Sequence, residues 1–259
     1  MAQRSSYKQG TPCWTDLQTT DVAGAKAFYG TLFGWTFNDL PTPMGAVYST
    51  ALVGSDSVAA IAPQPPMLAE RNVAPMWSTY LAVDSADDAV AAASASGGTV
   101  LMAADEIPGS GRMAVVADPT GATVGLWQAA EHIGATRVNE PNTVIWNELV
   151  TTDNAAALPF YKAVAGIDSV ATKMADFDYT LLKVDGEDVG GATSPQMAGV
   201  PNHWHTWFAV ADAVAVATAA KDAGGSLLVE PTDMPVGKMA TIRDPQGAVF
   251  SILQPPEQS

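Results

Sequence analysis

The spacing of apolar and polar residues predicts a strand, a helix and further strands at the start of the chain. Residues 14–20 alternate between the two kinds, as expected of a strand with one buried face. Asp21 predicts the start of a helix that runs to Phe33, because its carboxylate accepts the free N–H groups of the first turn. Gly34 ends that helix in a left-handed conformation. The elements expected next are strands at 47–52 and 58–61 and a Pro-rich loop over 63–75.

A second strand and helix follow in the same order. The strand covers 77–83, and we expect Asp84 to cap the helix and Gly97-Gly98 to end it. Asp118-Pro119-Thr120-Gly121 predicts a turn before the last strand of this part. The three strands that complete it are expected near 99–103, 113–117 and 123–128.

The whole order then occurs again in the second half of the chain. Residues 129–143 show no clear period and predict a linker between two domains, 1–128 and 144–259. The elements expected after it are a helix from Asp153, strands at 179–184 and 189–193, a loop over 194–202, a strand at 204–210, and a helix from Asp212 to Ala223 with Gly224-Gly225 before the final strands.

The residues themselves repeat along with the pattern. Trp14-Thr15-Asp16-Leu17 returns as Trp146-Asn147-Glu148-Leu149, an offset of 146 − 14 = 132 residues. Further matches at or near this offset pair Phe28-Tyr29 with Phe160-Tyr161, Trp77-Ser78-Thr79-Tyr80 with Trp204-His205-Thr206-Trp207, and Asp118-Pro119-Thr120-Gly121 with Asp244-Pro245-Gln246-Gly247. Two copies of one unit imply two related sites, and differences between the copies indicate where function has specialised.

Composition narrows the classes of partner. Twelve basic and 27 acidic residues give a net charge of −15, and no basic stripe is visible, which argues against a nucleic-acid ligand. The single cysteine, Cys13, excludes an internal disulfide, and its apolar strand favours a small buried side chain. Neither a secretory signal nor a membrane-spanning run is apparent, so we expect a cytoplasmic protein with no membrane partner.

The repeated strand–helix–strands unit, its aspartate-capped helix and the Asp-Pro-x-Gly turn resemble the vicinal oxygen chelate superfamily. That superfamily includes glyoxalase I, bleomycin-resistance proteins and extradiol dioxygenases, and double-length members occur in actinobacterial natural-product pathways. The resemblance covers residues 10–128 and 143–254. It implies an α+β fold: a tandem repeat of two glyoxalase-like domains, made of four βαβββ units whose curled mixed sheets form cups around a ligand or metal.

The resemblance also implies four metal-ligand positions in each cup, and few of them carry a donor here. The first-strand position falls on Trp14 and Trp146, whose indoles have no lone pair for a metal. The remaining positions fall on Ala60, Ser78 and Gly125 in one half and on Gly191, His205 and Ser251 in the other. Only His205 is a plausible ligand, whereas a zinc or iron site needs at least three protein donors. We therefore expect no bound metal and no other cofactor.

Residues two apart on a strand share a face, so the inward positions can be listed. They predict cups lined by aromatic, imidazole and thioether side chains, which suit a flat apolar ligand. The expected ligand-binding residues are Trp14, Trp146, His203, Trp207, Tyr80, Ser78, Ser251, Met113 and Met239. Each tryptophan could instead belong to the core.

Asp16, Glu148 and His205 are the candidate acid–base groups. Burial beside an indole raises the pKa of a carboxyl group and suits it to proton transfer. The alternative is that these carboxylates lie at a wet rim or accept backbone hydrogen bonds. His203 and His205 share one strand face and are expected to line a pocket.

Two pairings of the units remain open at this stage, one within each half and one between the halves. Either way the two histidines belong to a single cup, so the cups should be unequal. We expect the chain to be an intramolecular pseudo-dimer that is monomeric in solution. Its expected function is to bind a planar aromatic small molecule in natural-product resistance or biosynthesis. The alternative is a glyoxalase-like lyase, or an oxygenase or hydroxylase, that uses His205 with Asp16 or Glu148.

Overall fold

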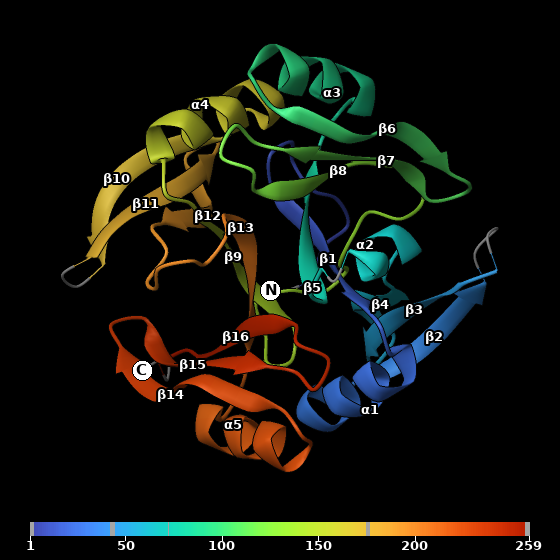
Figure 1. Cartoon of the computed structure of the whole chain (residues 1–259), viewed down its shortest axis with the longest axis vertical. Helices are drawn as coiled ribbons and strands as arrows, with labels where there is room; N and C mark the ends of the chain where they lie inside the picture. The colour runs from blue at the N-terminus through green and yellow to red at the C-terminus, as the bar shows by residue number, and fades with distance from the viewer. Residues whose placement is uncertain (1–2, 42–44, 72, 175–176, 257–259) are drawn as a thin grey trace.

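The computed structural model describes residues 3–41, 45–71, 73–174 and 177–256, which form two similar halves (Figure 1). The first half comprises β1 (Pro12–Thr19), α1 (Val22–Phe33), β2 (Thr36–Pro41), β3 (Val47–Val53), β4 (Asp56–Pro63), α2 (Pro66–Glu70), β5 (Met76–Ala82), α3 (Ala86–Ala95), β6 (Thr99–Ile107), β7 (Gly111–Ala117) and β8 (Thr123–Ala129). The second half comprises β9 (Val144–Val150), α4 (Asn154–Ala165), β10 (Asp168–Met174), β11 (Phe177–Val184), β12 (Glu187–Thr193), β13 (His203–Ala209), α5 (Ala213–Asp222), β14 (Ser226–Met234), β15 (Gly237–Arg243) and β16 (Val249–Gln254).

Each half forms one eight-stranded mixed sheet, and the two sheets have the same order. The first runs β2-β3-β4-β1-β5-β8-β7-β6 and the second β10-β11-β12-β9-β13-β16-β15-β14. The two βαβββ units of a half meet where β1 lies antiparallel to β5, and β9 to β13. The units therefore pair within each half, and the expected tandem α+β fold is confirmed.

Capping residues set the ends of the first helix in each half, as predicted. The Asp21 carboxylate accepts a hydrogen bond from the Gly24 N–H at 2.9 Å, and Gly34 ends α1 at φ 65°. Asp153 caps α4 in the same way, and Gly166 ends it at φ 73°. These short polar contacts satisfy backbone groups that a helix leaves unpaired at its ends.

Three local predictions were wrong. Ser85, not Asp84, caps α3, because its hydroxyl accepts the Asp88 N–H. The Pro-rich stretch contains the one-turn helix α2, since proline is well suited to the first turn of a helix. Strands β2 and β10 belong to the predicted βαβββ units, but the sequence pattern did not locate them. They are edge strands with mostly exposed residues, so their sequences lack the apolar alternation of a half-buried strand.

Two apolar cores join the halves. One core contains α1 and β4 of the first half together with Phe208, α5 and Phe250 of the second. The other contains α3 and β8 together with α4 and Trp204. In Figure 1, α3 and α4 accordingly lie side by side at one end of the molecule, and α1 and α5 at the other. The helix-bearing face of each sheet is thus buried against the other half, and the opposite face remains for a site.

A hydrogen-bonded chain crosses each core and explains two of the repeated motifs. The Tyr29 hydroxyl donates to Asp244 Oδ2 at 3.0 Å and accepts from the Trp77 indole N–H at 3.0 Å. Asp244 Oδ1 meanwhile accepts the N–H groups of its own Asp-Pro-x-Gly turn.

The other core has the same chain. There the Tyr161 hydroxyl bonds to Asp118 and to the Trp204 indole. The Phe-Tyr helix motif of one half is therefore tied to the turn motif of the other half. In the part of the chain that the structure describes, no helix has the length and apolarity needed to cross a bilayer.

Replacing Phe250 with alanine should lower the free energy of unfolding by about 3–5 kcal/mol, because the ring is lost from a packed core. Phe250 is 0% exposed and packs against Phe28, Tyr29 and Phe33 of the other half. Phe177, which is 51% exposed, is the matched control. Urea unfolding followed by circular dichroism measures both variants. Equal losses for Phe250→Ala and Phe177→Ala would contradict this account of the core.

Candidate functional site

The inner face of each sheet carries the site residues predicted from the alternation. We call these sets the first cup (Trp14, Asp16, Ser78, Tyr80, Met113 and Gly125) and the second cup (Trp146, Glu148, His203, His205, Trp207, Met239 and Ser251). Equivalent positions have equivalent partners: Trp14 lies opposite Tyr80, and Trp146 opposite Trp207. Asp16 lies opposite Ser78, and Glu148 opposite His205. Both histidines of β13 therefore belong to the second cup.

The first cup is closed by its own hydrogen bonds. The Trp14 indole donates to the Tyr48 hydroxyl at 2.8 Å, and Tyr48 donates to Asp16 Oδ2 at 3.3 Å. The Tyr80 hydroxyl also donates to Asp16 Oδ2, at 2.9 Å. One carboxylate oxygen therefore holds two phenol hydroxyls.

The segment between β8 and β9 fills the rest of the first cup. The His132 ring meets the Trp14 ring edge to face at 4.6 Å and the Trp127 ring at 5.5 Å between centroids. Two hydrogen bonds hold this segment in place, one from the Ala135 N–H to the Cys13 carbonyl and one from the Tyr7 hydroxyl to the Ala135 carbonyl. Trp14, Tyr80 and Trp127 are all buried as a result.

Asp16 is a buried acid in this closed setting. Burial raises its pKa to about 6, although the hydroxyl groups of Tyr80, Tyr48 and Ser78 favour the charged form and lower it. Asp16 Oδ1 is buried without a hydrogen-bond partner of ordinary geometry. Asp16 is 5% exposed, and the two tyrosines that donate to it lie against it.

The second cup is more open. Trp146, Glu148 and Trp207 are each partly exposed, whereas their first-cup counterparts Trp14, Asp16 and Tyr80 are buried. The contrast is reversed at one position, where His205 is buried and its counterpart Ser78 is partly exposed. The Trp146 indole donates to the Tyr179 hydroxyl at 2.8 Å, as Trp14 does to Tyr48. Leu253 occupies the strand position equivalent to Trp127. No ring of the described residues stacks on Trp146 as His132 does on Trp14.

Glu148 and Trp207 form a polar pair in the wall of the second cup. Burial raises the Glu148 pKa to about 7, while the nearby Tyr179 hydroxyl and Trp207 indole lower it in part. Neither neighbour makes a hydrogen bond of ordinary geometry with the carboxyl group in the described structure. The Trp207 N–H is itself buried without such a partner. The Trp207 N–H therefore keeps bonding capacity that no neighbour of ordinary geometry uses.

His205 is held beside this pair as a neutral imidazole. Its Nε2 lies 2.8 Å from Ser251 Oγ, and that hydroxyl lies 2.9 Å from the Thr241 hydroxyl. Burial, and then repulsion from His203, lower the His205 pKa to about 3. Burial also lowers the pKa of His203, whose Nδ1 bonds to the Pro201 carbonyl at 2.8 Å. At neutral pH His205 is thus a hydrogen-bonding group and not an acid.

The expected ligand positions do not fit a metal. Among the described residues no three His, Cys, Asp or Glu side chains are grouped so that they could hold an ion. At Gly191 an added Cβ would lie 1.8 Å from the Tyr179 hydroxyl oxygen, and at Gly125 an added Cβ would lie 2.0 Å from the Tyr80 ring. Tyrosines thus occupy the space beside Gly125 and Gly191, two of the expected ligand positions. Ser251, a third, is hydrogen-bonded to His205.

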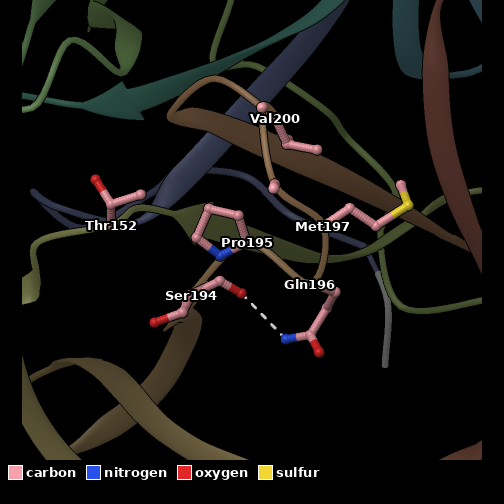
Figure 2. A pocket seen from close by; sticks show the side chains of 8 residues that line it. Thr152, Ser194, Pro195, Gln196, Met197 and Val200 are labelled. Carbon is pink, nitrogen blue, oxygen red and sulfur yellow. Dashed lines mark hydrogen bonds between the residues drawn. The ribbon is translucent and has the colours of Figure 1, made fainter.

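A separate open hollow of about 310 Å³ lies beside the loop between β12 and β13. Figure 2 shows Pro195, Gln196 and Met197 around it, with the Gln196 amide donating to the Ser194 carbonyl at 3.0 Å. None of its lining residues carries a titratable side chain, and it includes no member of either cup. It therefore offers no evident chemistry.

Both halves of the chain match one family model. Residues 13–126 and 132–252 each match the model described as the Glyoxalase/Bleomycin resistance protein/Dioxygenase superfamily. The chain belongs to this superfamily. It is 52% identical over 261 residues to the putative glyoxylase CFP32 of Mycobacterium tuberculosis, with 100% of both chains covered. It is 34% identical over 259 residues to the anthracycline biosynthesis protein DnrV of Streptomyces peucetius, covering 96% of this chain and 94% of the relative.

Solved structures of the superfamily share the fold. The Mn(II)-bound glyoxalase from Novosphingobium aromaticivorans superposes with a TM-score of 0.66 at 14% identity, covering 95% of this chain and 82% of that one. The 2,3-dioxygenase LapB from Pseudomonas sp. KL28 superposes with a TM-score of 0.66 at 15% identity, covering 96% of this chain and 93% of that one. At these identities the superfamily likeness establishes architecture alone.

Sequence reasoning missed three residues that define the cups: Tyr48, Tyr179 and His132. The two tyrosines occupy equivalent strands of the repeat, so an alignment of the halves beyond the tryptophan motifs would have indicated them. His132 gave no such signal. The segment that carries it joins the two halves, so the repeat contains no second copy of it, and its apolar residues follow no regular period.

Replacing Glu148 with glutamine should remove a pH dependence of stability. The folded chain keeps this proton up to about pH 7, whereas an ordinary glutamic acid releases it near 4.5. The native state thus binds more protons in that window, and this group lowers the free energy of unfolding as pH rises from 4.5 to 7. His205 contributes the opposite slope below 6.5, so the comparison must be made between wild type and variant.

We therefore expect the stability of Glu148→Gln, relative to wild type, to increase steadily from pH 4.5 to pH 7. Urea midpoints at several pH values in this window measure the difference. The exposed Glu70→Gln controls for the loss of one negative charge. A difference that stays constant with pH would contradict the burial of Glu148.

Proposed function

We propose that the chain binds a planar aromatic small molecule in the second cup, without a metal. The observation that carries the proposal is the pair of partly exposed indoles, Trp146 and Trp207, which lie opposite each other on neighbouring strands beside Glu148, with the Trp207 N–H left without a partner of ordinary geometry. An aromatic pair contributes about 0.5–1.5 kcal/mol beyond the burial of its area, so two indoles favour a flat ligand over a branched one.

The closed first cup supports this choice of site. The His132 ring already packs edge to face on Trp14 there, and two tyrosine hydroxyls donate to Asp16 Oδ2. A ligand at that site would have to displace the segment between β8 and β9. The ligand role expected for Trp14, Ser78, Tyr80 and Met113 is therefore not part of the proposal.

The relatives indicate the kind of ligand to test. DnrV is named for anthracycline biosynthesis, and anthracyclines contain fused planar rings. We propose an accessory role in the biosynthesis of, or resistance to, such a natural product. The fused-ring probe 1,4-dihydroxyanthraquinone, titrated against the tryptophan fluorescence of the protein, tests the proposal directly. Absence of saturable quenching would contradict it.

A glyoxalase-like lyase is the second candidate, and Glu148 is the observation that favours it. A carboxyl group with a pKa of about 7 can take and return a proton near neutral pH. The relative CFP32 is named a putative glyoxylase. Against this candidate, His205 is neutral and Asp16 is fully enclosed, so Glu148 would act alone. Turnover of a hemithioacetal that is lost in Glu148→Gln would favour the lyase.

The metal-free site predicts that purified protein holds no stoichiometric transition metal. Only His205 among the expected ligand positions offers a strong donor, and three are needed for a tight site. Elemental analysis after dialysis, with and without prior exposure to zinc, manganese and ferrous iron, measures this. One metal ion per chain, released in His205→Ala, would overturn the metal-free proposal.

Replacing His205 with alanine should weaken binding of 1,4-dihydroxyanthraquinone far more than Ser78→Ala. Loss of a buried polar partner costs about 1–3 kcal/mol, or roughly fivefold to a hundredfold in Kd. Ser78 is the equivalent residue of the closed cup and serves as the matched control. Equal effects in two folded variants would place the ligand elsewhere.

A further inference from the structure

One position distinguishes the two cups chemically. Tyr80 in β5 lies opposite Trp14 on one side and Gly125 on the other. Trp207 in β13 lies at the equivalent place, opposite Trp146 and Ser251. The phenol of the first cup has therefore become an indole in the second, while the neighbouring tryptophan and carboxyl group are retained.

The first cup shows what its carboxylate binds. Asp16 Oδ2 accepts from the Tyr80 hydroxyl at 2.9 Å and from the Tyr48 hydroxyl at 3.3 Å. In the first cup, therefore, phenol hydroxyls of the protein itself are hydrogen-bonded to the carboxylate, and a tryptophan ring lies beside them.

The second cup retains only one of the two phenols. Tyr179 matches Tyr48, since each accepts the hydrogen bond of the first-strand tryptophan. No phenol replaces Tyr80, and Trp207 presents a buried N–H without a partner instead. Glu148 therefore has the Trp207 indole nearby where Asp16 has the Tyr80 hydroxyl.

The residue opposite Trp207 on the neighbouring strand also differs between the two cups. In the first cup the Tyr80 ring lies over Gly125, where an added Cβ would be 2.0 Å away. Ser251 at the equivalent position carries a side chain, which is bonded to His205. The residue opposite Trp207 therefore has a side chain where the residue opposite Tyr80 has none.

We propose that the ligand of the second cup is a phenol, and that its hydroxyl is bound jointly by Glu148 and Trp207. The hydroxyl donates its proton to the Glu148 carboxyl group and accepts the Trp207 N–H, because a hydroxyl group has one donor and two acceptor positions. The rings of Trp146 and Trp207 hold the aromatic part. The proposal rests on the proposed function and names the chemical class of its ligand.

Two probes of nearly equal shape test the hydroxyl. 2-Naphthol carries it, and 2-methoxynaphthalene has a methyl group in place of the proton. We expect wild type to bind 2-naphthol about tenfold more tightly, the effect of one hydrogen bond to a charged or polar group. Isothermal titration measures both affinities. Glu148→Met, which has similar length but no acceptor, should lose the preference and keep its affinity for 2-methoxynaphthalene, while the exposed Glu70→Met should change neither.

The outcomes separate this proposal from the previous one. Equal affinities of wild type for both probes would overturn phenol recognition and leave aromatic binding standing. Failure of both probes and of 1,4-dihydroxyanthraquinone to bind would overturn both proposals. A hydroxyl preference that persists in Glu148→Met would show that another group recognises the hydroxyl.

If Glu148→Met does not fold, the fluorescence emission of bound 2-naphthol tests the same contact. Excited 2-naphthol is a strong acid and gives its proton to an adjacent carboxylate, so the bound ligand should emit as naphtholate in wild type. Glu148→Gln keeps the shape of the side chain but cannot take the proton, and its complex should emit as neutral naphthol. Identical emission from the two complexes would contradict contact between the hydroxyl and Glu148.

Discussion

Burial of the helix-bearing sheet faces between the two halves is the constraint on which the rest of the structure depends. Each core draws one unit from each half, so neither half can bury its own outer face alone. The Tyr29–Asp244 and Tyr161–Asp118 hydrogen bonds fix the register of this packing, because each joins a helix of one half to a turn of the other. Burying two such aromatic cores is the dominant stabilising contribution to the fold.

The same constraint determines where a site can lie. Along β13, alternate residues point to opposite faces, so Trp204, Thr206 and Phe208 lie toward the other half while His205 and Trp207 face the second cup. With the interface fixed, the inner faces are free to differ. One cup is covered by a segment of the chain, and the other keeps Trp146, Trp207 and Glu148 partly exposed. The two copies of the unit therefore differ in how far their inner faces are exposed.

Local residue chemistry made most of the fold predictable. The alternation assigned Trp146 and Glu148 to one face, and Asp21 and Gly34 marked the ends of α1, because these signals lie within a few residues of sequence. Edge strands β2 and β10 escaped prediction, since strands exposed over most of their residues leave no periodic signal. Pairing within or between the halves could not be decided from the sequence, because either arrangement buries the same faces. The contact of His132 with the first cup depends on the path of an irregular segment and was equally out of reach.

The central claim is that the second cup, and not the first, receives the ligand. A crystal structure of the chain grown with 2-naphthol tests it most directly. The account predicts a ring between Trp146 and Trp207, with its oxygen within hydrogen-bonding distance of Glu148 and with His132 still stacked on Trp14. Density for the ring in the first cup with His132 displaced, or only in the hollow beside Met197, would contradict it.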